Sequence, residues 1–168
     1  MKKNLKEAIE EIFKEIPDPR RRWPDYLYRK VVEHLAIPCI DVVVVHGNDF
    51  MLVKRKNEPA KNQWWPLGGR IFKGETLEEA ATRKMREETG LIPLTFQQLG
   101  AWETSFEKSA FGVSTQSINV AYMATIAKKE VRLDDDHTNY QWFTHINPSW
   151  HPYVKDILIK SNFLFPYD

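Results

Sequence analysis

Residues 76–90 form the most sharply bounded element of this sequence, and they limit how the chain around them can fold. Thr76 is followed three residues later by Glu79, a capping-box pattern that starts a helix by satisfying its unpaired N–H groups. Gly90 stands where a glycine in the left-handed conformation ends a helix. The segment is therefore predicted to be a helix with a defined start and a defined end.

The inward face of this predicted helix is chemically mixed. It carries Leu77 and Ala81, which suit a core, together with Lys84 and Glu88, while Glu87 lies at the opposite margin. A carboxylate turned toward the protein is costly unless it is paired or bound to a cation. Two interpretations are open on periodicity alone. Lys84 and Glu88 form an ion pair at i,i+4, or the neighbouring carboxylates supply oxygen ligands to Mg²⁺.

The size and composition of the chain predict one soluble domain. A length of 168 residues with 42% hydrophobic content suits a single packed core. The formal charge of +1 gives no basic field for nucleic acid, and the Arg20–Arg22 cluster is too small to supply one. No apolar run reaches the ~18–20 residues of a membrane span. The single Cys39 excludes an internal disulfide, and no signal-peptide pattern opens the chain. We therefore expect a cytoplasmic protein without membrane or nucleic-acid partners.

Strands are predicted on both sides of the 76–90 helix. The β-branched run 40–45 is nearly all apolar, which is typical of a strand buried on both faces, and 50–55 follows a turn as its antiparallel partner. Further strands are predicted at 94–103, 117–126 and 140–143, and further helices at 4–16, 26–35 and 149–161. This order predicts an α+β fold, layered as an α/β/α sandwich with a mixed β-sheet. We place an N-terminal helical extension at 1–35 and the main domain at 36–168.

The segment 68–91 resembles the Nudix box. That pattern is Gly, five residues, Glu, seven residues, and then Arg-Glu-apolar-any-Glu-Glu-any-Gly-apolar. Eight of its nine specified positions match here, namely Gly69, Glu75, Arg83, Met85, Glu87, Glu88, Gly90 and Leu91. The resemblance implies an α/β/α sandwich in which a loop–helix–loop binds Mg²⁺, or alternatively Mn²⁺, on a nucleoside diphosphate-linked substrate.

Lys84 is the one departure from the box. It stands where ordinary Nudix pyrophosphatases have a glutamate that helps to hold the divalent cations. A lysine in that place repels a second or third metal ion at short range in a poorly screened site. The departure predicts fewer metal ions and argues against attack on phosphorus by a metal-bound water.

The stretch 36–143 resembles the GDP-mannose mannosyl hydrolases, a branch of the family that attacks the anomeric carbon of the sugar and also lacks this glutamate. In the first strand, Asp41 matches a substrate-site aspartate. Arg55, in the segment KRKNEPAKNQWW, matches a phosphate-binding arginine, and Arg70 matches a second arginine that contacts the diphosphate. Together with Arg83 of the box, these residues are the predicted substrate-binding set.

The same resemblance implies a metal site and a general base. The metal ligands would be the Gly68 carbonyl and the side chains of Glu88 and Asp136, and Glu87 is an acidic group that this branch lacks. In the segment LDDDHTNYQWF, His137 matches the general base, and an imidazole is suited to this task near neutral pH. The predicted catalytic residues are His137, Arg70, Arg55 and Glu88.

The activity implied is Mg²⁺-dependent hydrolysis of a GDP-mannose-like nucleoside diphosphate sugar to NDP and free sugar. Two alternatives stay open. A conventional Nudix pyrophosphatase, cleaving the diphosphate of an NDP-sugar, ADP-ribose or an NTP, is favoured by the presence of both Glu87 and Glu88. A catalytically silent nucleotide-binding domain is favoured if Lys84 neutralises Glu88. Related enzymes are dimers, which leaves a homodimer as one option.

Overall fold

The computed structural model describes positions 4, 7, 10, 11 and 14 and residues 23–163. The strands are β1 (Ile37–His46), β2 (Asp49–Arg55), β3 (Trp64–Trp65), β4 (Leu67–Arg70), β5 (Pro93–Phe106), β6 (Thr115–Ile126) and β7 (His137–Phe143). The helices are α2 (Asp25–His34), α3 (Leu77–Thr89) and α4 (Pro152–Lys160). Most of the predicted helix over 4–16 lies outside the described residues. The Arg20–Arg22 cluster lies wholly outside them.

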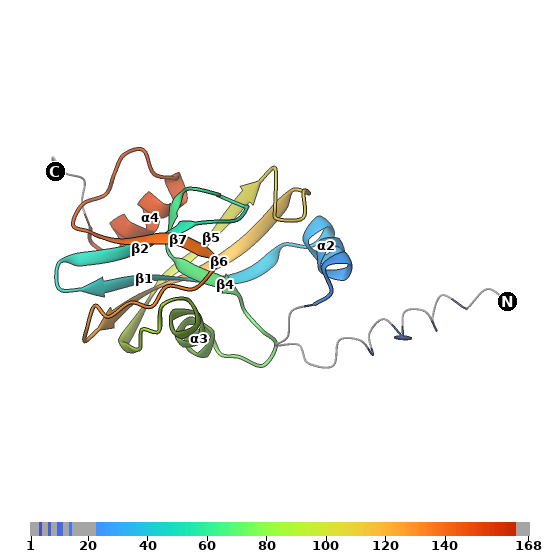
Figure 1. The fold of residues 1–168 in the computed structure, drawn as a ribbon, viewed down its shortest axis with the longest axis horizontal. Coiled ribbons are helices and arrows are strands. Elements are labelled where there is room, and N and C mark those ends of the chain that lie inside the picture. Colours follow the sequence, from blue (N-terminus) through green and yellow to red (C-terminus); the bar gives the residue numbers. More distant parts are fainter. Residues whose placement is uncertain (1–3, 5–6, 8–9, 12–13, 15–22, 164–168) are drawn as a thin grey trace.

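These strands form one mixed sheet with the order β3-β2-β1-β6-β5, to which β4 adds by pairing with β1 and β7 by pairing with β2. Helix α3 covers one face of the sheet and α4 covers the other, while α2 lies beside β6 near the start of β1 (Figure 1). This arrangement confirms the predicted α/β/α sandwich. None of the helices in the described part of the chain is long and apolar enough to cross a membrane.

The central strand β1 has partners that bring the site together. It pairs in parallel with β6 and, through a tight turn, antiparallel with β2. It also pairs antiparallel with β4, which places Gly68 opposite Asp41 and Arg70 opposite Cys39. The sequence does not predict β4, because it is four residues long and half glycine. Its pairing lays the start of the 68–91 segment against the strand that carries Asp41.

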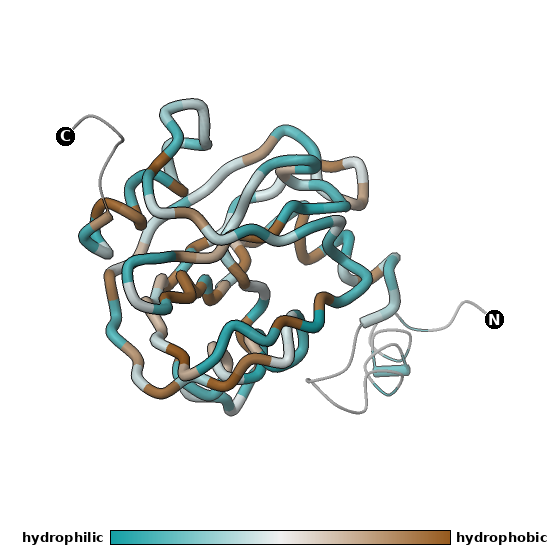
Figure 2. Tube along the Cα trace, turned by 60° about the vertical axis from the view of Figure 1, so that its left-hand side comes forward, coloured by the Kyte–Doolittle hydropathy of each residue, from teal (hydrophilic) through white to brown (hydrophobic). Residues whose placement is uncertain are grey.

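Side chains of β1 alternate between two cores. Val43 and Val45 pack on the face that α4 covers, whereas Val42 and Val44 pack on the face that α3 covers. Both faces of the strand are therefore dry, which is why the predicted run is apolar at successive positions. In Figure 2, hydrophobic stretches run through the interior strands, and many of the outer turns are hydrophilic.

Helix α3 has the predicted ends. Glu79 N donates to Thr76 Oγ1 at 3.2 Å, and Thr76 N donates to Glu79 Oε2 at 2.8 Å, so both halves of the capping box form. Gly90 adopts the left-handed conformation with φ of 71°, and its N–H donates to the Arg86 carbonyl. The helix buries Ala81 and Glu88 on the same face, as the periodicity predicts.

Candidate active site

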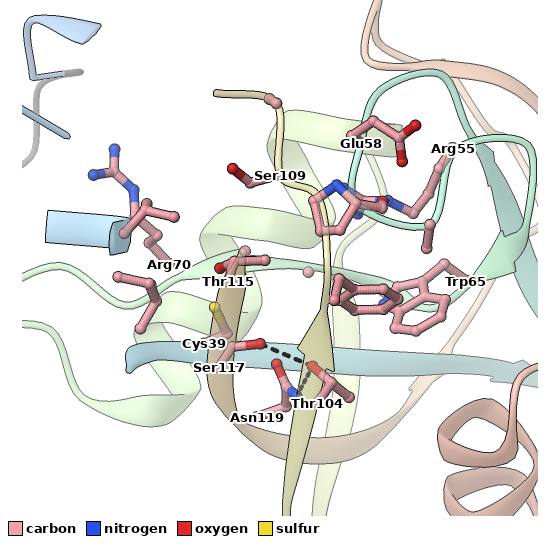
Figure 3. A pocket seen from close by; sticks show the side chains of 18 of the residues that line it. Cys39, Arg55, Glu58, Trp65, Arg70, Thr104, Ser109, Thr115, Ser117 and Asn119 are labelled. Carbon is pink, nitrogen blue, oxygen red and sulfur yellow. Dashed lines mark hydrogen bonds between the residues drawn. The ribbon is translucent and has the colours of Figure 1, made fainter. Parts of the chain in front are cut away.

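A cavity of about 250 Å³ opens between α2, the 56–66 loop, β1 and the β5–β6 hairpin. Four of the predicted site residues line it, namely Asp41, Arg55, Gly68 and Arg70. In Figure 3, Arg55, Glu58 and Trp65 lie at one side of the cavity and Arg70 at the other. The sheet pairing described above brings these residues together from positions up to 29 apart in the sequence, and the cavity is the candidate substrate site.

Asp41 lines this cavity and is 4% exposed. The Tyr153 hydroxyl, from α4, donates to its Oδ2 at 2.5 Å. Burial raises the pKa of Asp41 to about 7, against the opposing effects of this hydrogen bond and of the Arg55 charge. A side chain at Gly68 would place its Cβ 2.5 Å from the Ile40 carbonyl oxygen and overlap Asp41 Oδ1, so only glycine fits there.

Arg55 ends β2 and is partly buried at the edge of the cavity. Its Nε donates to the Pro59 carbonyl at 2.7 Å, which fixes the direction of the guanidinium. Among the described residues no carboxylate lies within 4.0 Å of it, and burial lowers its pKa against the more distant Asp41 and Glu88 charges. A partly buried guanidinium whose remaining donors have no carboxylate partner is suited to bind an anion such as a phosphate.

Arg70, at the end of β4, lies over an aromatic ring of α2. The carbon of its guanidinium is 4.0 Å from the centre of the Tyr28 ring, and Tyr28 in turn contacts Phe111 edge-on at 5.4 Å. Burial raises the pKa of Tyr28, against the Arg70 charge. Stacking leaves the donors at the rim of a guanidinium free to bind oxygen atoms in its plane. The sequence does not single out Tyr28, because it lies before the segment that carries the resemblance.

The inward carboxylate of α3 forms an ion pair. Lys84 Nζ lies 2.5 Å from Glu88 Oε1, and the Gly68 N–H donates to Glu88 Oε2 at 3.2 Å. Burial raises the pKa of Glu88, and the Lys84 charge opposes this rise. Burial works to lower the pKa of Lys84, but the Glu88 and Glu87 charges hold it above its usual value. Of the two interpretations of the helix, the structure contains the Lys84–Glu88 pair.

Arg83 is engaged within the 68–91 segment. It donates to both Glu75 oxygens, at 2.6 and 3.0 Å, to the Arg70 carbonyl at 2.9 Å and to Glu87 Oε2 at 3.1 Å. These bonds tie the helix to the preceding loop and hold Glu87 in place. Arg83 does not line the cavity. The contact of Arg83 with substrate therefore stays a prediction. The contacts that the structure shows hold the loop and the helix of the 68–91 segment together.

His137 begins β7, opposite Arg55 of β2. Its side chain is 7% exposed, and its Nδ1 lies 2.7 Å from Asp134 Oδ1. A carboxylate at Nδ1 favours the tautomer with the proton on that nitrogen, which leaves Nε2 free to accept a proton. His137 does not line the cavity, but the backbone N–H of its partner Asp134 donates to the Glu88 carbonyl at 3.0 Å, so it lies near the C-terminal end of α3. The sequence alone does not single out Asp134 as the orienting partner of His137, although their i,i+3 spacing is a usable signal.

The predicted metal ligands do not form a ready site for a divalent ion. Carboxylate and carbonyl oxygens have the chemistry that Mg²⁺ prefers. However, Lys84 and the Gly68 N–H already engage both oxygens of Glu88, and Asp136 Oδ1 accepts a hydrogen bond from Asn57 at 3.2 Å. Within the described part of the chain, no three His, Cys, Asp or Glu side chains are arranged to hold a metal ion. A divalent ion at Glu88 would have to displace Lys84.

Comparison with known proteins settles the family. The sequence profile of the NUDIX domain matches residues 34–153, which is well over half of the chain. The chain belongs to the Nudix family. This family generally uses divalent metal ions such as Mg²⁺. The part of this Nudix protein before residue 34, which includes Tyr28, lies outside the matched region.

Two curated relatives of this Nudix protein carry different functional names. It is 30% identical over 142 residues to the low-salt glycan biosynthesis protein Agl8 of Haloferax volcanii, covering 83% of this chain and 91% of that protein. It is 33% identical over 110 residues to an ADP-ribose pyrophosphatase of Methanocaldococcus jannaschii, which covers 66% of this chain and 62% of the relative.

Solved structures agree on the fold. A MutT Nudix hydrolase from Burkholderia pseudomallei superimposes with a TM-score of 0.65 at 21% identity, covering 76% of this chain and 98% of that one. The Nudix domain of Shewanella oneidensis NrtR, complexed with ADP-ribose, gives a TM-score of 0.57 at 21% identity, covering 76% of this chain and 86% of that one. At these identities the likeness establishes the Nudix sandwich and nothing about the substrate.

Proposed function

We propose that this Nudix protein hydrolyses a nucleoside diphosphate sugar of the GDP-mannose type, releasing NDP and free sugar by attack of water on the anomeric carbon. The observation that carries the proposal is the cavity that Asp41, Arg55, Gly68 and Arg70 share. These are the residues that match the GDP-mannose mannosyl hydrolases. Similarity to a glycan biosynthesis protein adds support, because glycans are assembled from activated sugars.

The residues of the chain supply the charge and the proton acceptor that this reaction requires. In the step, water forms a bond to the anomeric carbon, the bond between that carbon and the diphosphate oxygen breaks, and NDP departs with the electron pair. Arg55 and Arg70 bind the phosphate oxygens and stabilise the negative charge that develops on them. His137, oriented by Asp134, takes the proton from the water.

A single Mg²⁺ belongs to this proposal, with Gly68, Glu87, Glu88 and Asp136 as the candidate ligands. Such an ion, when bound, supplies additional positive charge at the diphosphate. At Glu88 this ion would take the place of the Lys84 ammonium, and the positive charge of Lys84 close to the carboxylate argues against a second ion.

The isotope experiment tests the proposal directly. The protein is incubated with GDP-mannose in ¹⁸O-water, and the products are analysed by mass spectrometry and by NMR of the fresh sugar. Attack on carbon gives unlabelled GDP and a sugar of inverted configuration. Label in GDP, or the products GMP and mannose 1-phosphate, would show attack on phosphorus.

Conventional pyrophosphatase activity is the second candidate, favoured by the similarity to an ADP-ribose pyrophosphatase and by the presence of both Glu87 and Glu88. It predicts AMP and ribose 5-phosphate from ADP-ribose. A catalytically silent nucleotide-binding domain is the third, favoured by the Lys84–Glu88 pair. It predicts nucleotide binding by calorimetry without Mg²⁺ and no turnover of any NDP-sugar.

A further inference from the structure

The floor of the cavity carries a cluster of neutral polar side chains from β5 and β6. Asn119 Nδ2 donates to Thr104 Oγ1 at 3.0 Å, and Thr104 Oγ1 lies 2.9 Å from Ser117 Oγ. Figure 3 shows the three side chains joined by these two bonds between the Arg55 and Arg70 sides of the cavity. We call Thr104, Ser117 and Asn119 the polar floor.

The fold does not require polarity at these positions. On the same face of β6, the side chains change from Ser117 and Asn119 under the cavity to Ala121 and Met123 in the core beneath α4. Asparagine is disfavoured in the interior of strands, and Asn119 is 4% exposed. Apolar groups of similar shape would satisfy a sheet interior at little or no cost in stability. The change therefore coincides with the cavity, which points to a ligand.

The polar floor has hydrogen-bonding capacity left for a ligand. Thr104 and Ser117 have two hydroxyl hydrogens, and one of them is used between the two residues, so the other can donate outward. No described residue donates to Asn119 Oδ1, which leaves an acceptor beside that donor. Burial raises the pKa of the neighbouring Cys39 to about 12, so its thiol is uncharged at neutral pH. A neutral surface with both donors and acceptors matches alcohol groups better than phosphate, which favours cationic donors.

The position of the floor fits one sugar ring next to the diphosphate. Cys39 of β1 pairs with Arg70 on one side and with Asn119 on the other. On β6, Asn119 lies two residues from Ala121, which is the partner of Asp41 on β1. At ~3.3 Å per residue, the levels of Asn119 and Asp41 are therefore about 7 Å apart along the strands. Trp65 and Phe106, with ring centres 5.8 Å apart, also line the cavity and give it an apolar wall. The volume of about 250 Å³ lies below the ~300–1,000 Å³ of pockets that enclose a whole drug-sized ligand, so the cavity encloses one end of an NDP-sugar.

We propose that the polar floor is the sugar subsite of this protein. The hydroxyls of Thr104 and Ser117 and the Asn119 side chain bind hydroxyl groups of the sugar, while its ring packs on Trp65 and Phe106. The inference rests on the proposed function. It adds that the cavity binds, and so selects, the sugar part of the substrate. The nucleotide then lies toward the open rim.

The test separates the sugar from the nucleotide. Wild type is first assayed with Mg²⁺ against GDP-mannose, GDP-fucose and UDP-glucose, and the best of them is taken as the substrate. Thr104→Val and Ser117→Ala each remove one hydroxyl from the floor. Ser105→Ala is the matched control, because Ser105 is exposed and precedes a residue of the cavity wall without lining it. Melting temperatures confirm that each variant is folded.

We expect each floor variant to lower kcat/KM for the sugar nucleotide about 3- to 10-fold, the effect of one neutral hydrogen bond, mainly through KM. The inhibition constant of the sugar-free NDP should change less than 2-fold, and Ser105→Ala should behave as wild type. Unchanged kinetics in both floor variants would overturn the sugar subsite alone. An equal loss of NDP binding would place the nucleotide there instead and also overturn it. A wild type that neither binds nor turns over any of the sugar nucleotides would overturn the proposed function, and the subsite with it.

Discussion

Replacing Lys84 by methionine tests what holds the inward carboxylate of α3. The change removes the ammonium that lies 2.5 Å from Glu88 and keeps an unbranched chain of similar length. Glu88, 4% exposed, then retains the 3.2 Å hydrogen bond from Gly68 N. Removing one partner of a buried ion pair destabilises proteins by ~3–5 kcal/mol. Because the retained hydrogen bond offsets part of this loss, we expect the free energy of unfolding to fall by about 2–4 kcal/mol at pH 8.

The loss should depend on pH in a defined direction. Burial raises the pKa of Glu88, and without the opposing Lys84 charge it rises further. A carboxyl whose pKa is raised in the folded state contributes stability that is fully present below its unfolded pKa and is lost as the pH rises through the folded value. The deficit of Lys84→Met should therefore be small near pH 4 and grow toward pH 8. Mg²⁺ that binds the freed carboxylate should reduce the deficit at pH 8.

Urea unfolding of wild type and Lys84→Met at pH 4 and pH 8, with EDTA or with Mg²⁺, measures all of these effects. Lys108→Met, at an exposed lysine, is the matched control and should stay within about 0.5 kcal/mol of wild type. Equal stability of wild type and Lys84→Met at pH 8 in EDTA would refute the reasoning, because it would mean that Glu88 does not depend on an internal cation.

Three further substitutions test the site. Tyr153→Phe removes the hydroxyl that donates to Asp41, so the pKa of Asp41 should rise above about 7. The acidic limb of the kcat/KM–pH profile should then move to higher pH, and an unmoved limb would exclude Asp41 as the titrating group. Gly68→Ala forces a methyl group against Asp41 and should lower the free energy of unfolding by ~1–3 kcal/mol in urea titrations; unchanged stability would mean that the strands separate easily. His137→Gln should lower kcat by ~10²–10⁴ and leave the calorimetric affinity for NDP unchanged, and an unaltered kcat would assign the general base elsewhere.

Local sequence patterns predicted the elements with strong signals of their own. The capping box at Thr76 and the glycine at position 90 mark the ends of α3, and both ends form as expected because their hydrogen bonds connect residues a few positions apart. The continuous apolar run of β1 predicted a strand buried on both faces, which the two cores confirm. β3 and β4 escaped prediction because pairing with β2 and β1 defines them, and no pattern inside two or four residues records that pairing.

The candidate site divides in the same way. The sequence alone determined its chemistry: which arginines, acids and histidine this Nudix protein has, and that a lysine replaces one acid of the box. The tertiary structure alone decided the pairing: that Lys84 lies on Glu88, that Tyr153 reaches Asp41 across 112 residues, and that Tyr28 lies against Arg70. Helix periodicity left the state of Glu88 open because an ion pair and a metal site need the same inward carboxylate. Contacts between distant strands and helices depend on how two cores pack against one sheet, and this is a property of the whole fold that no single segment encodes.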